Sequence, residues 1–243
     1  FRVLWSWLHP VAWQFRNSES MTIPVLTIVG PSGSGKGPIA AVIADKLGWQ
    51  ILDSGALYRL AGYSADNKSI DFKDIEKLVD NTLDMDVRFE QGSVLLDGTD
   101  VSKQIRTETN GNLASKIAVI PEIRNALLQW QRDYVKEPGL VADGRDMGTV
   151  VFPEAEIKIF LDASAEVRAK RRYKQLIEKG LSANLADLVS EIQERDDRDR
   201  NRSVAPLCAA EDAVIIDSSE MTIAEVVNIV LDSVKSRLPQ LEF

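Results

Sequence analysis

The chain has 243 residues, of which 44% are hydrophobic and 27% charged, a balance typical of one α/β domain with an insertion or of two small domains. Its net charge of −8 argues against a broad surface for nucleic acid or for an anionic membrane. The single cysteine, Cys208, cannot form an intrachain disulfide, so we expect a protein of the reducing cytoplasm. The single histidine, His9, lies near the N-terminus, so we expect neither a zinc site nor a histidine base in the main domain.

Residues 1–20 differ from the remainder of the chain. They contain Trp5, Trp7 and Trp13, precede Met21, and are too short and too interrupted by polar residues to span a bilayer. They also lack the small-residue cleavage site of a signal peptide. We interpret them as a leader that is non-native or disordered, and assign residues 21–243 to the folded domain. The alternative is a weak membrane or partner anchor built on the tryptophans.

Strands and helices alternate along most of the chain. Apolar runs at 25–29, 50–53, 139–144, 156–162 and 212–217 are typical of buried strands. Helical spacing separates them at 39–47, 54–65, 71–80, 106–136, 164–202 and 222–238, with a break expected at Pro121. Five apolar strands joined by helices predict an α/β fold with a doubly wound, five-stranded parallel sheet.

One segment departs from this alternation. Residues 84–102 show the apolar–polar alternation of half-buried strands, with turn signals at Gln91-Gly92 and Asp97-Gly98. We predict a small antiparallel sheet inserted at 84–105, and a separate helical lid at about 170–202.

The stretch between the first strand and the first helix has the spacing of a phosphate-binding loop, or P-loop. Its glycines let main-chain amides converge on phosphate oxygens, and Lys36 supplies a positive charge for the β- and γ-phosphates. Gly37 stands where many such loops have Ser or Thr, so Mg²⁺ would be held by nucleotide oxygens and water. The alternative is a glycine-rich turn that binds nothing. The expected nucleotide-binding residues are Gly30, Pro31, Ser32, Gly33, Ser34, Gly35, Lys36, Gly37 and Pro38.

The P-loop and the motifs "LDSGALYR", "ADGRDMGTVVFP", "KIFLDAS" and "ERDDRDRNR", in this order, resemble bacterial cytidylate kinases. The resemblance runs from about Ile23 to Leu238. It implies transfer of the γ-phosphoryl group of ATP to CMP or dCMP with Mg²⁺, in pyrimidine nucleotide metabolism. It also implies that the small-sheet insertion enlarges the part that covers the monophosphate. The acceptor is already an anion, so such an enzyme needs positioning and charge neutralisation rather than a general base.

The resemblance assigns the monophosphate to a set of arginines and nearby polar groups. Arg59, Arg145 and Arg202 would hold the CMP phosphate, because a guanidinium grips phosphate with two donors and stays charged. Arg59 lies a little more than one helical turn beyond Ser54, so both can face the same pocket. The alternative for each arginine is a surface pair with a neighbouring acid.

Ser115, Arg124 and Asp146 match the residues that read the base. A carboxylate accepts from the 4-amino group of cytosine and an arginine donates to its acceptors, a combination that rejects uracil. Ser115 is the weakest of the three, since a serine on a helix surface needs no such role.

Arg195 and Asp199 match the ribose contacts and lie four residues apart, on one helical face. On pattern alone, "ERDDRDRNR" is equally typical of a solvated, salt-bridged helix. Arg171, Arg172 and Arg198 are unranked candidates for arginines that cover the transferring phosphoryl group. Asp143 is the expected acid of the Mg²⁺ shell, acting through water. The predicted catalytic set is Lys36, Arg145, Arg198 and Arg202.

Pro38 is the main departure from the family pattern, which has threonine there. It makes credible the alternative of a P-loop protein that binds nucleotide but has impaired turnover. A separate alternative is another small P-loop kinase, acting on a different monophosphate or on shikimate. We expect nucleotides as the only partners, no nucleic acid or membrane, and a monomer.

Overall fold

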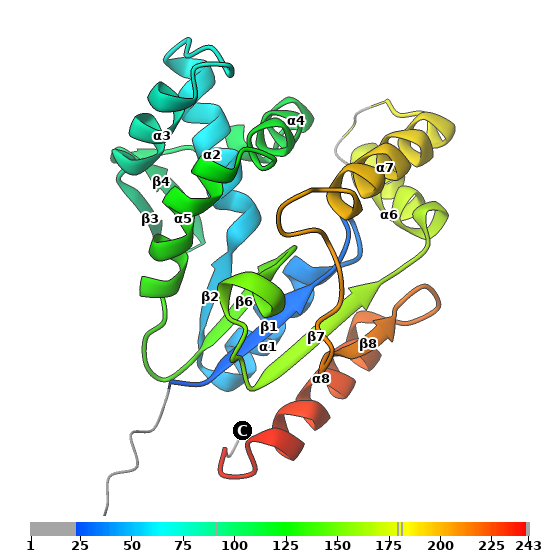
Figure 1. The fold of residues 1–243 in the computed structure, drawn as a ribbon. Helices are drawn as coiled ribbons and strands as arrows, with labels where there is room; N and C mark the ends of the chain where they lie inside the picture. The colour runs from blue at the N-terminus through cyan, green and yellow to red at the C-terminus, as the bar shows by residue number, and fades with distance from the viewer. Residues whose placement is uncertain (1–22, 91, 179, 181, 242–243) are drawn as a thin grey trace, which may run out of the picture.

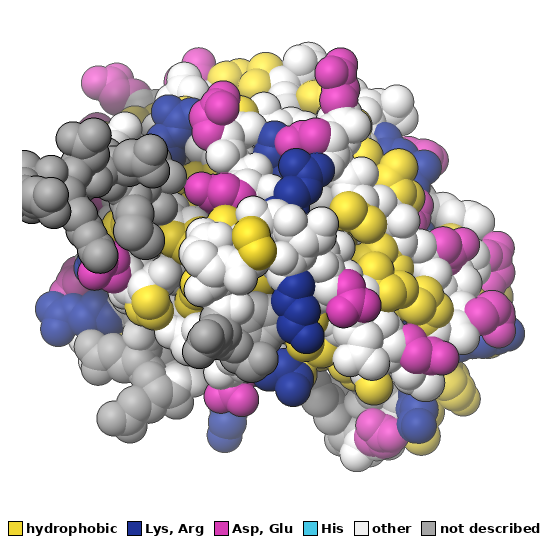
Figure 2. All heavy atoms as spheres, turned by 90° about the horizontal axis from the view of Figure 1, so that it is seen from below, with side chains coloured by type: hydrophobic (Ala, Val, Ile, Leu, Met, Phe, Trp, Pro, Cys, Tyr) yellow, Lys and Arg dark blue, Asp and Glu magenta, His cyan; other side chains and the backbone are white. Residues whose placement is uncertain are grey.

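The computed structural model describes residues 23–241, except 91, 179 and 181. The expected leader, 1–20, therefore lies outside the described residues. Within the described part, no helix combines the length and the apolar character needed to cross a membrane. On the face seen from below, acidic and basic side chains are mixed rather than gathered by sign (Figure 2).

The predicted five-stranded parallel sheet is confirmed. Its order is β2-β6-β1-β7-β8, and every neighbouring pair runs parallel. The register pairs Val29 of β1 with Gly144 of β6, and Asp53 of β2 with Asp143 of β6. The carboxyl ends of these strands therefore meet at one edge of the sheet, where ligands of open α/β sheets bind. The strands are β1 (Val25–Val29), β2 (Gln50–Asp53), β6 (Leu140–Gly144), β7 (Ile157–Asp162) and β8 (Val214–Asp217).

Both faces of the sheet are covered, which explains the continuous apolar strands. Along β1, Val25 and Val29 belong to one core and Leu26 and Ile28 to the other. The first core is closed by α2 (Ser54–Asn67), α3 (Ile75–Leu83) and α5 (Pro121–Asp133), and the second by α1 (Lys36–Leu47) and α8 (Ile223–Arg237). Figure 1 shows these two layers around the sheet.

The segment after α3 forms the predicted small antiparallel sheet, in which β3 (Val87–Glu90), β4 (Ser93–Leu96) and β5 (Thr99–Asp100) follow one another. Phe89 of β3 lies edge-on to the rings of Trp130 and Tyr134, each with its centroid 6.2 Å away. These contacts fix the small sheet to α5.

The remaining helices frame the edge of the sheet. The chain continues through a short 3₁₀ turn (Gln104–Arg106) into α4 (Glu108–Ile117), and Pro121 opens α5, as a proline in the first turn of a helix can. Figure 1 places α4 and the small sheet on one side of the parallel sheet, and α6 (Ala165–Glu178) with α7 (Leu185–Arg200) on the other.

Two local expectations need correction. The helix predicted at 71–80 begins only at Ile75, because the side chain of Asp74 caps it by accepting from the Lys77 amide at 3.2 Å. The segment Met147–Val151, directly after Asp146, forms a π-helical turn that the apolar pattern did not predict. Such turns are frequent at functional sites.

Candidate nucleotide-binding site

The predicted P-loop joins the end of β1 to the start of α1. Gly33 and Gly35 have φ values of +78° and +100°, a left-handed conformation that favours glycine. At Gly30 a Cβ atom would lie 2.0 Å from the carbonyl oxygen of Leu161, so a side chain would collide with β7. The glycines therefore allow the loop to turn tightly over the strand ends, and α1 begins at Lys36 with free amides in its first turn.

Lys36 is buried at the base of this loop, where its Nζ donates to the carbonyl of Pro31 at 2.8 Å. Burial and the positive charge of Arg145 lower the pKa of Lys36, while the nearby carboxylate of Asp143 acts in the opposite direction. Burial raises the pKa of Asp143, against the effect of Lys36. A bound phosphate would restore the balance of charge around the lysine.

Asp143 faces the start of α1, since a Cβ atom at Gly37 would lie 3.7 Å from its Oδ2. No group of three or more His, Cys, Asp or Glu residues that could hold a metal ion occurs in the part of the chain that the structure describes. A single carboxylate such as that of Asp143 fits Mg²⁺, which keeps several waters and binds through one or two carboxylates together with phosphate oxygens.

Pro38 lies in the first turn of α1 without disrupting the helix. The next residue, Ile39, makes the first helical hydrogen bond, from its amide to the Gly35 carbonyl at 3.3 Å. Four residues before Pro38, the carbonyl of Ser34 accepts instead from Arg171 Nη1 at 3.3 Å and from Ser218 Oγ at 3.4 Å. The carbonyl that an amide at position 38 would meet in a regular helix therefore has other partners.

A second, arginine-lined cavity of about 60 Å³ adjoins the carboxyl end of β6. It is smaller than the roughly 300–1,000 Å³ of typical ligand pockets, and several side chains of its walls pair with one another. Every residue that the sequence assigned to the monophosphate lines it: Ser54, Arg59, Ser115, Arg124, Arg145, Asp146, Arg195, Asp199 and Arg202.

At one end of the cavity, Arg124 forms a buried ion pair with Asp146 and donates to the carbonyl of Ala118 at 3.2 Å. The ring of Tyr58 lies under the guanidinium, with 5.7 Å between the Arg124 Cζ and the ring centroid. Burial raises the pKa of Asp146, although Arg124 and Arg202 oppose it. Ser115 is buried beside this pair, and its hydroxyl donates to the Gly111 carbonyl at 3.1 Å.

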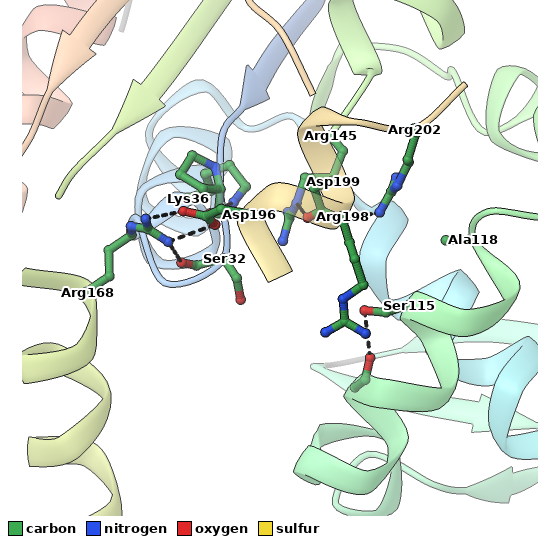
Figure 3. A network of polar contacts seen from close by, with 12 residues as sticks. Ser32, Lys36, Ser115, Ala118, Arg145, Arg168, Asp196, Arg198, Asp199 and Arg202 are labelled. Carbon is green, nitrogen blue, oxygen red and sulfur yellow. Dashed lines mark hydrogen bonds and ion pairs between the residues drawn. The ribbon is translucent and has the colours of Figure 1, made fainter. Parts of the chain in front are cut away.

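At the other end, several arginines surround one carboxylate (Figure 3). Asp199 accepts from Arg145 Nε at 2.8 Å and forms an ion pair with Arg202. Burial of Arg195, with the repulsion of Arg145, lowers its pKa to about 10, and its Nε has no partner among the described residues. Arg59 donates to the Ile105 carbonyl at 2.8 Å. This excess of positive charge in a largely buried space suits a polyanion.

Other predicted residues lie outside this cavity. Lys36 and Asp143 belong to the P-loop side. Arg198 is exposed, and among the described residues its side chain donates to the Glu194 carbonyl of its own helix, at 3.4 Å. Arg172 of α6 forms an ion pair with Glu108 of α4. The roles of these side chains in phosphoryl transfer stay predictions.

Sequence reasoning missed a buried pair between the two lid helices. Arg168 of α6 forms an ion pair with Asp196 of α7 and donates to the Ser32 carbonyl of the P-loop at 3.0 Å (Figure 3). Charges occur on nearly every face of α7, so the sequence gives no sign that Asp196 points inward. Tyr58 was also missed, because an aromatic residue in an amphipathic helix is usually a core residue.

A parallel sheet with a P-loop at its central strand, and an arginine-lined cavity at the same edge, defines a P-loop phosphotransferase that acts on a small anionic acceptor. Residues 26–236 match the cytidylate kinase family, and the chain belongs to this family.

The chain is also similar in sequence to curated cytidylate kinases over most of their length. The cytidylate kinase of Aeromonas salmonicida (strain A449) is 56% identical over 219 residues, covering 88% of this chain and 95% of the relative. That of Vibrio vulnificus (strain YJ016) is 53% identical over 225 residues, covering 91% and 100%. A solved structure of an uncharacterized protein from Eubacterium ventriosum is 13% identical, covers 89% of this chain and 100% of its own, and has a TM-score of 0.52, a likeness in fold alone.

Proposed function

We propose that the protein transfers the γ-phosphoryl group of ATP to CMP or dCMP, giving ADP and CDP or dCDP. The observation that carries the choice of base is the buried pair of Arg124 and Asp146 in the arginine-lined cavity. The Asp146 carboxylate would accept from the 4-amino group of cytosine, and Arg124 would donate to the ring nitrogen and carbonyl. Uracil would turn a carbonyl toward Asp146, which cannot donate when it is ionised.

The phosphate of the acceptor is assigned to Arg59, Arg145 and Arg202, and the ribose to Arg195 and Asp199. Arg145 and Arg202 both pair with Asp199, so a bound phosphate would take over part of the charge that this carboxylate neutralises. Ser54 at the start of α2 lines the same space and completes the polar wall. Binding of the phosphate would exchange part of these pairs for contacts with its oxygens.

The P-loop, from Gly30 to Pro38, is assigned to ATP, with Lys36 on the β- and γ-phosphates. An oxygen of the CMP phosphate would attack the γ-phosphorus while the bond to the β-phosphate oxygen breaks, and the electron pair leaves with ADP. The attacking oxygen carries no proton, so this chain has to supply orientation, charge and exclusion of water rather than a base. Bound Mg²⁺, held through water by Asp143, would neutralise the β- and γ-oxygens.

Arg198, Arg171 and Arg172 are assigned to the lid at 170–202, where they would cover the phosphoryl group during its transfer. The small sheet at 84–105 is assigned to the part that closes over the monophosphate. A cytoplasmic location, a monomeric state and the absence of nucleic-acid or membrane partners stay predictions of the sequence.

The test is a coupled assay of ADP release with CMP, dCMP, UMP, AMP and shikimate as acceptors. We expect kcat/KM to be highest for CMP and dCMP, and Asp146→Ala to lower it for CMP by about 2–4 kcal/mol, roughly 30- to 1,000-fold. Asp133→Ala, an exposed carboxylate of α5, is the control and should behave as the starting protein. Equal or better kcat/KM with UMP or AMP would overturn the assignment of the base readers.

The alternative, a family member that binds nucleotide but turns over little because of Pro38, is not favoured by the 56% and 53% identity to cytidylate kinases. Isothermal titration with CMP and with a non-hydrolysable ATP analogue, compared with the assay of ADP release, separates this alternative from the proposed function. Binding of both CMP and the analogue without ADP release would support the alternative.

A further inference from the structure

The P-loop is held from outside by two arginines of α6. Arg168 donates to the Ser32 carbonyl at 3.0 Å, and Arg171, one turn further on, donates to the Ser34 carbonyl at 3.3 Å. In a trans peptide the C=O group and the following N–H group point in opposite directions. Because the two carbonyls point toward α6, the amides of Gly33 and Gly35 point away from it. Phosphate oxygens bind to converging amides of this kind.

Arg168 does more than hold the loop, because the same guanidinium binds α7. Its Nη1 donates to Asp196 Oδ1 at 3.0 Å, its Nη2 pairs with the other carboxylate oxygen, and its Nε donates to the Ala163 carbonyl at 2.8 Å. The side chains of Arg168 and Asp196 are only 3% and 12% exposed. A Cβ atom at Gly33 would lie 3.4 Å from the Cβ of Arg168, so the loop packs directly on the arginine stem.

Asp196 stands next to the residues that line the arginine-lined cavity. Arg195 precedes it and Asp199 follows one turn later on α7, and both face that cavity. A shift of α7 that brings Arg195 and Asp199 onto an acceptor therefore moves Asp196, and through Arg168 it moves the Ser32 peptide of the P-loop. The bridge from Ser32 through Arg168 to Asp196 thus joins the two halves of the site (Figure 3).

We propose that Arg168 and Asp196 are positioning residues that couple the P-loop to the acceptor cavity, so that a nucleoside triphosphate and a nucleoside monophosphate each tighten binding of the other. The proposal rests on the proposed function for the identity of the two ligands. Neither residue lines the acceptor cavity, so their effect lies in the linkage between two sites rather than in binding of the monophosphate itself. By thermodynamic linkage, the triphosphate must tighten binding of the monophosphate by the same factor as the monophosphate tightens binding of the triphosphate.

The experiment measures the dissociation constant of CMP by titration calorimetry, with and without a saturating non-hydrolysable ATP analogue and Mg²⁺. For the starting protein we expect the analogue to tighten CMP binding by a factor within the range of about 5- to 150-fold that is usual for coupled sites. Arg168→Lys keeps the charge but loses the planar fork, and Asp196→Asn keeps the shape but loses the charge. Both should reduce the factor to near one, with the dissociation constant of CMP alone changed by less than about twofold.

Asp212→Asn is the matched control, since it also removes the carboxylate of an ion pair, with Lys158 on β7, away from both ligands. It should keep the full coupling factor, and Asp196→Glu should retain most of it. A ligand-independent readout is amide exchange at Ser34, whose N–H donates to the Pro31 carbonyl within the loop at 3.5 Å and should exchange faster in Asp196→Asn.

Three results would overturn the proposal. They are an unchanged coupling factor in both variants, an equal loss of CMP binding with and without the analogue, and a lower melting temperature with no change in coupling or in exchange at the loop. Absence of any coupling in the starting protein would overturn it as well. If the starting protein bound neither CMP nor the ATP analogue, the proposed function itself would fail, and unaltered exchange at the loop in Asp196→Asn would still separately refute the positioning role.

Discussion

Arg145, at the end of β6, donates a hydrogen bond of 2.8 Å from its Nε to Oδ2 of Asp199 on α7. The other oxygen of the same carboxylate pairs with Arg202. Burial alone would raise the pKa of Asp199, but Arg145 and Arg202 outweigh it and hold that pKa below its ordinary value. One carboxylate therefore holds in place two of the arginines that are assigned to the phosphate.

Replacing this carboxylate should make the cavity depend on an added anion. In Asp199→Asn, Arg145 and Arg202 lose their partner and repel each other, and an unpaired buried charge typically costs about 3–5 kcal/mol of stability. Inorganic phosphate should then raise the melting temperature of Asp199→Asn more than that of the starting protein. Asp197→Asn, an exposed neighbour on the same helix, should respond as the starting protein does. Equal shifts in all three proteins would show that Asp199 does not balance the arginines.

The pH dependence of ATP use should reflect the buried pair of Lys36 and Asp143. Burial raises the pKa of Asp143 to about 6, and burial with the charge of Arg145 lowers the pKa of Lys36 to about 7. Asp143 is ionised only above its pKa and Lys36 is charged only below its own, so kcat/KM for ATP should be highest between about pH 6 and 7 and fall on both sides. These are pKa values of the free enzyme, which kcat/KM reports.

The fall of activity at high pH should occur at different pH values for kcat and for kcat/KM. Bound phosphates favour charged Lys36 and raise its pKa, so the fall in kcat should occur at higher pH than the fall in kcat/KM. Asp143→Asn removes a charge that raises the pKa of Lys36, and should move the descending limb of kcat/KM to lower pH. A kcat/KM for ATP that climbs steadily from pH 7 to 8 would contradict the assignment of Lys36.

Closure over the substrates should involve the Arg172–Glu108 ion pair, which joins α6 to α4. The pair borders a cleft of about 970 Å³ between the small sheet and the lid, whose walls include Ser93, Asp100 and Arg172. Hydrogen exchange with CMP and a non-hydrolysable ATP analogue should show protection at 84–102 and 170–202, since phosphoryl transfer has to exclude water. Unchanged exchange in both segments would defeat the idea of closure.

Loss of this pair should have a small effect, because the side chains are 31% and 53% exposed and such pairs contribute about 0–1 kcal/mol. We expect Glu108→Gln to change KM for ATP by less than about fivefold. Lys174→Gln, which breaks a pair within α6, is the control and should leave KM unchanged. A change of a hundredfold would mean that Glu108 has a direct role in binding.

The sequence predicted the parallel sheet because each buried strand is a continuous apolar run, as at 25–29, and each is bounded by a helix. It predicted the P-loop because Gly30, Gly35 and Lys36 have the required spacing between a strand and a helix, and the left-handed conformation of Gly35 agrees with the need for glycine there. These features depend on short-range sequence, and the structure confirms them.

The Arg168–Asp196 pair could not be found in this way. On α7, Asp196 and Asp199 are buried while Asp197 is exposed, yet all belong to one run of alternating charges. Which carboxylate points inward is decided by α6 and by the P-loop, far away in the sequence. The π-helical turn at Met147–Val151 was missed for a different reason: it rests on local main-chain hydrogen bonds, from the amides of Val150 and Val151 to the carbonyl of Asp146 at 2.9 and 3.2 Å, which an apolar pattern does not reveal.

Pro38 should weaken ATP use without harming the fold. The helix forms around it, and the Ser34 carbonyl that an amide at this position would otherwise meet is already bound by Arg171 and Ser218. A restored amide at position 38 is therefore free to donate to a phosphate of ATP, and a threonine would add a hydroxyl beside it. A charge-assisted hydrogen bond contributes about 1.5–3 kcal/mol, so the specificity constant for ATP should be reduced roughly ten- to a hundredfold in the present chain.

Two substitutions separate the missing donors. Pro38→Ala restores the amide alone, and Pro38→Thr restores both the amide and a hydroxyl. We expect kcat/KM for ATP to increase in Pro38→Ala and further in Pro38→Thr. The affinity for CMP should hardly change, because Pro38 does not line the acceptor cavity. If the threonine variant is no faster, the loop is adequate with proline. If no variant turns over although CMP and the ATP analogue bind, the protein is a nucleotide-binding member of the family, and the defect lies beyond position 38.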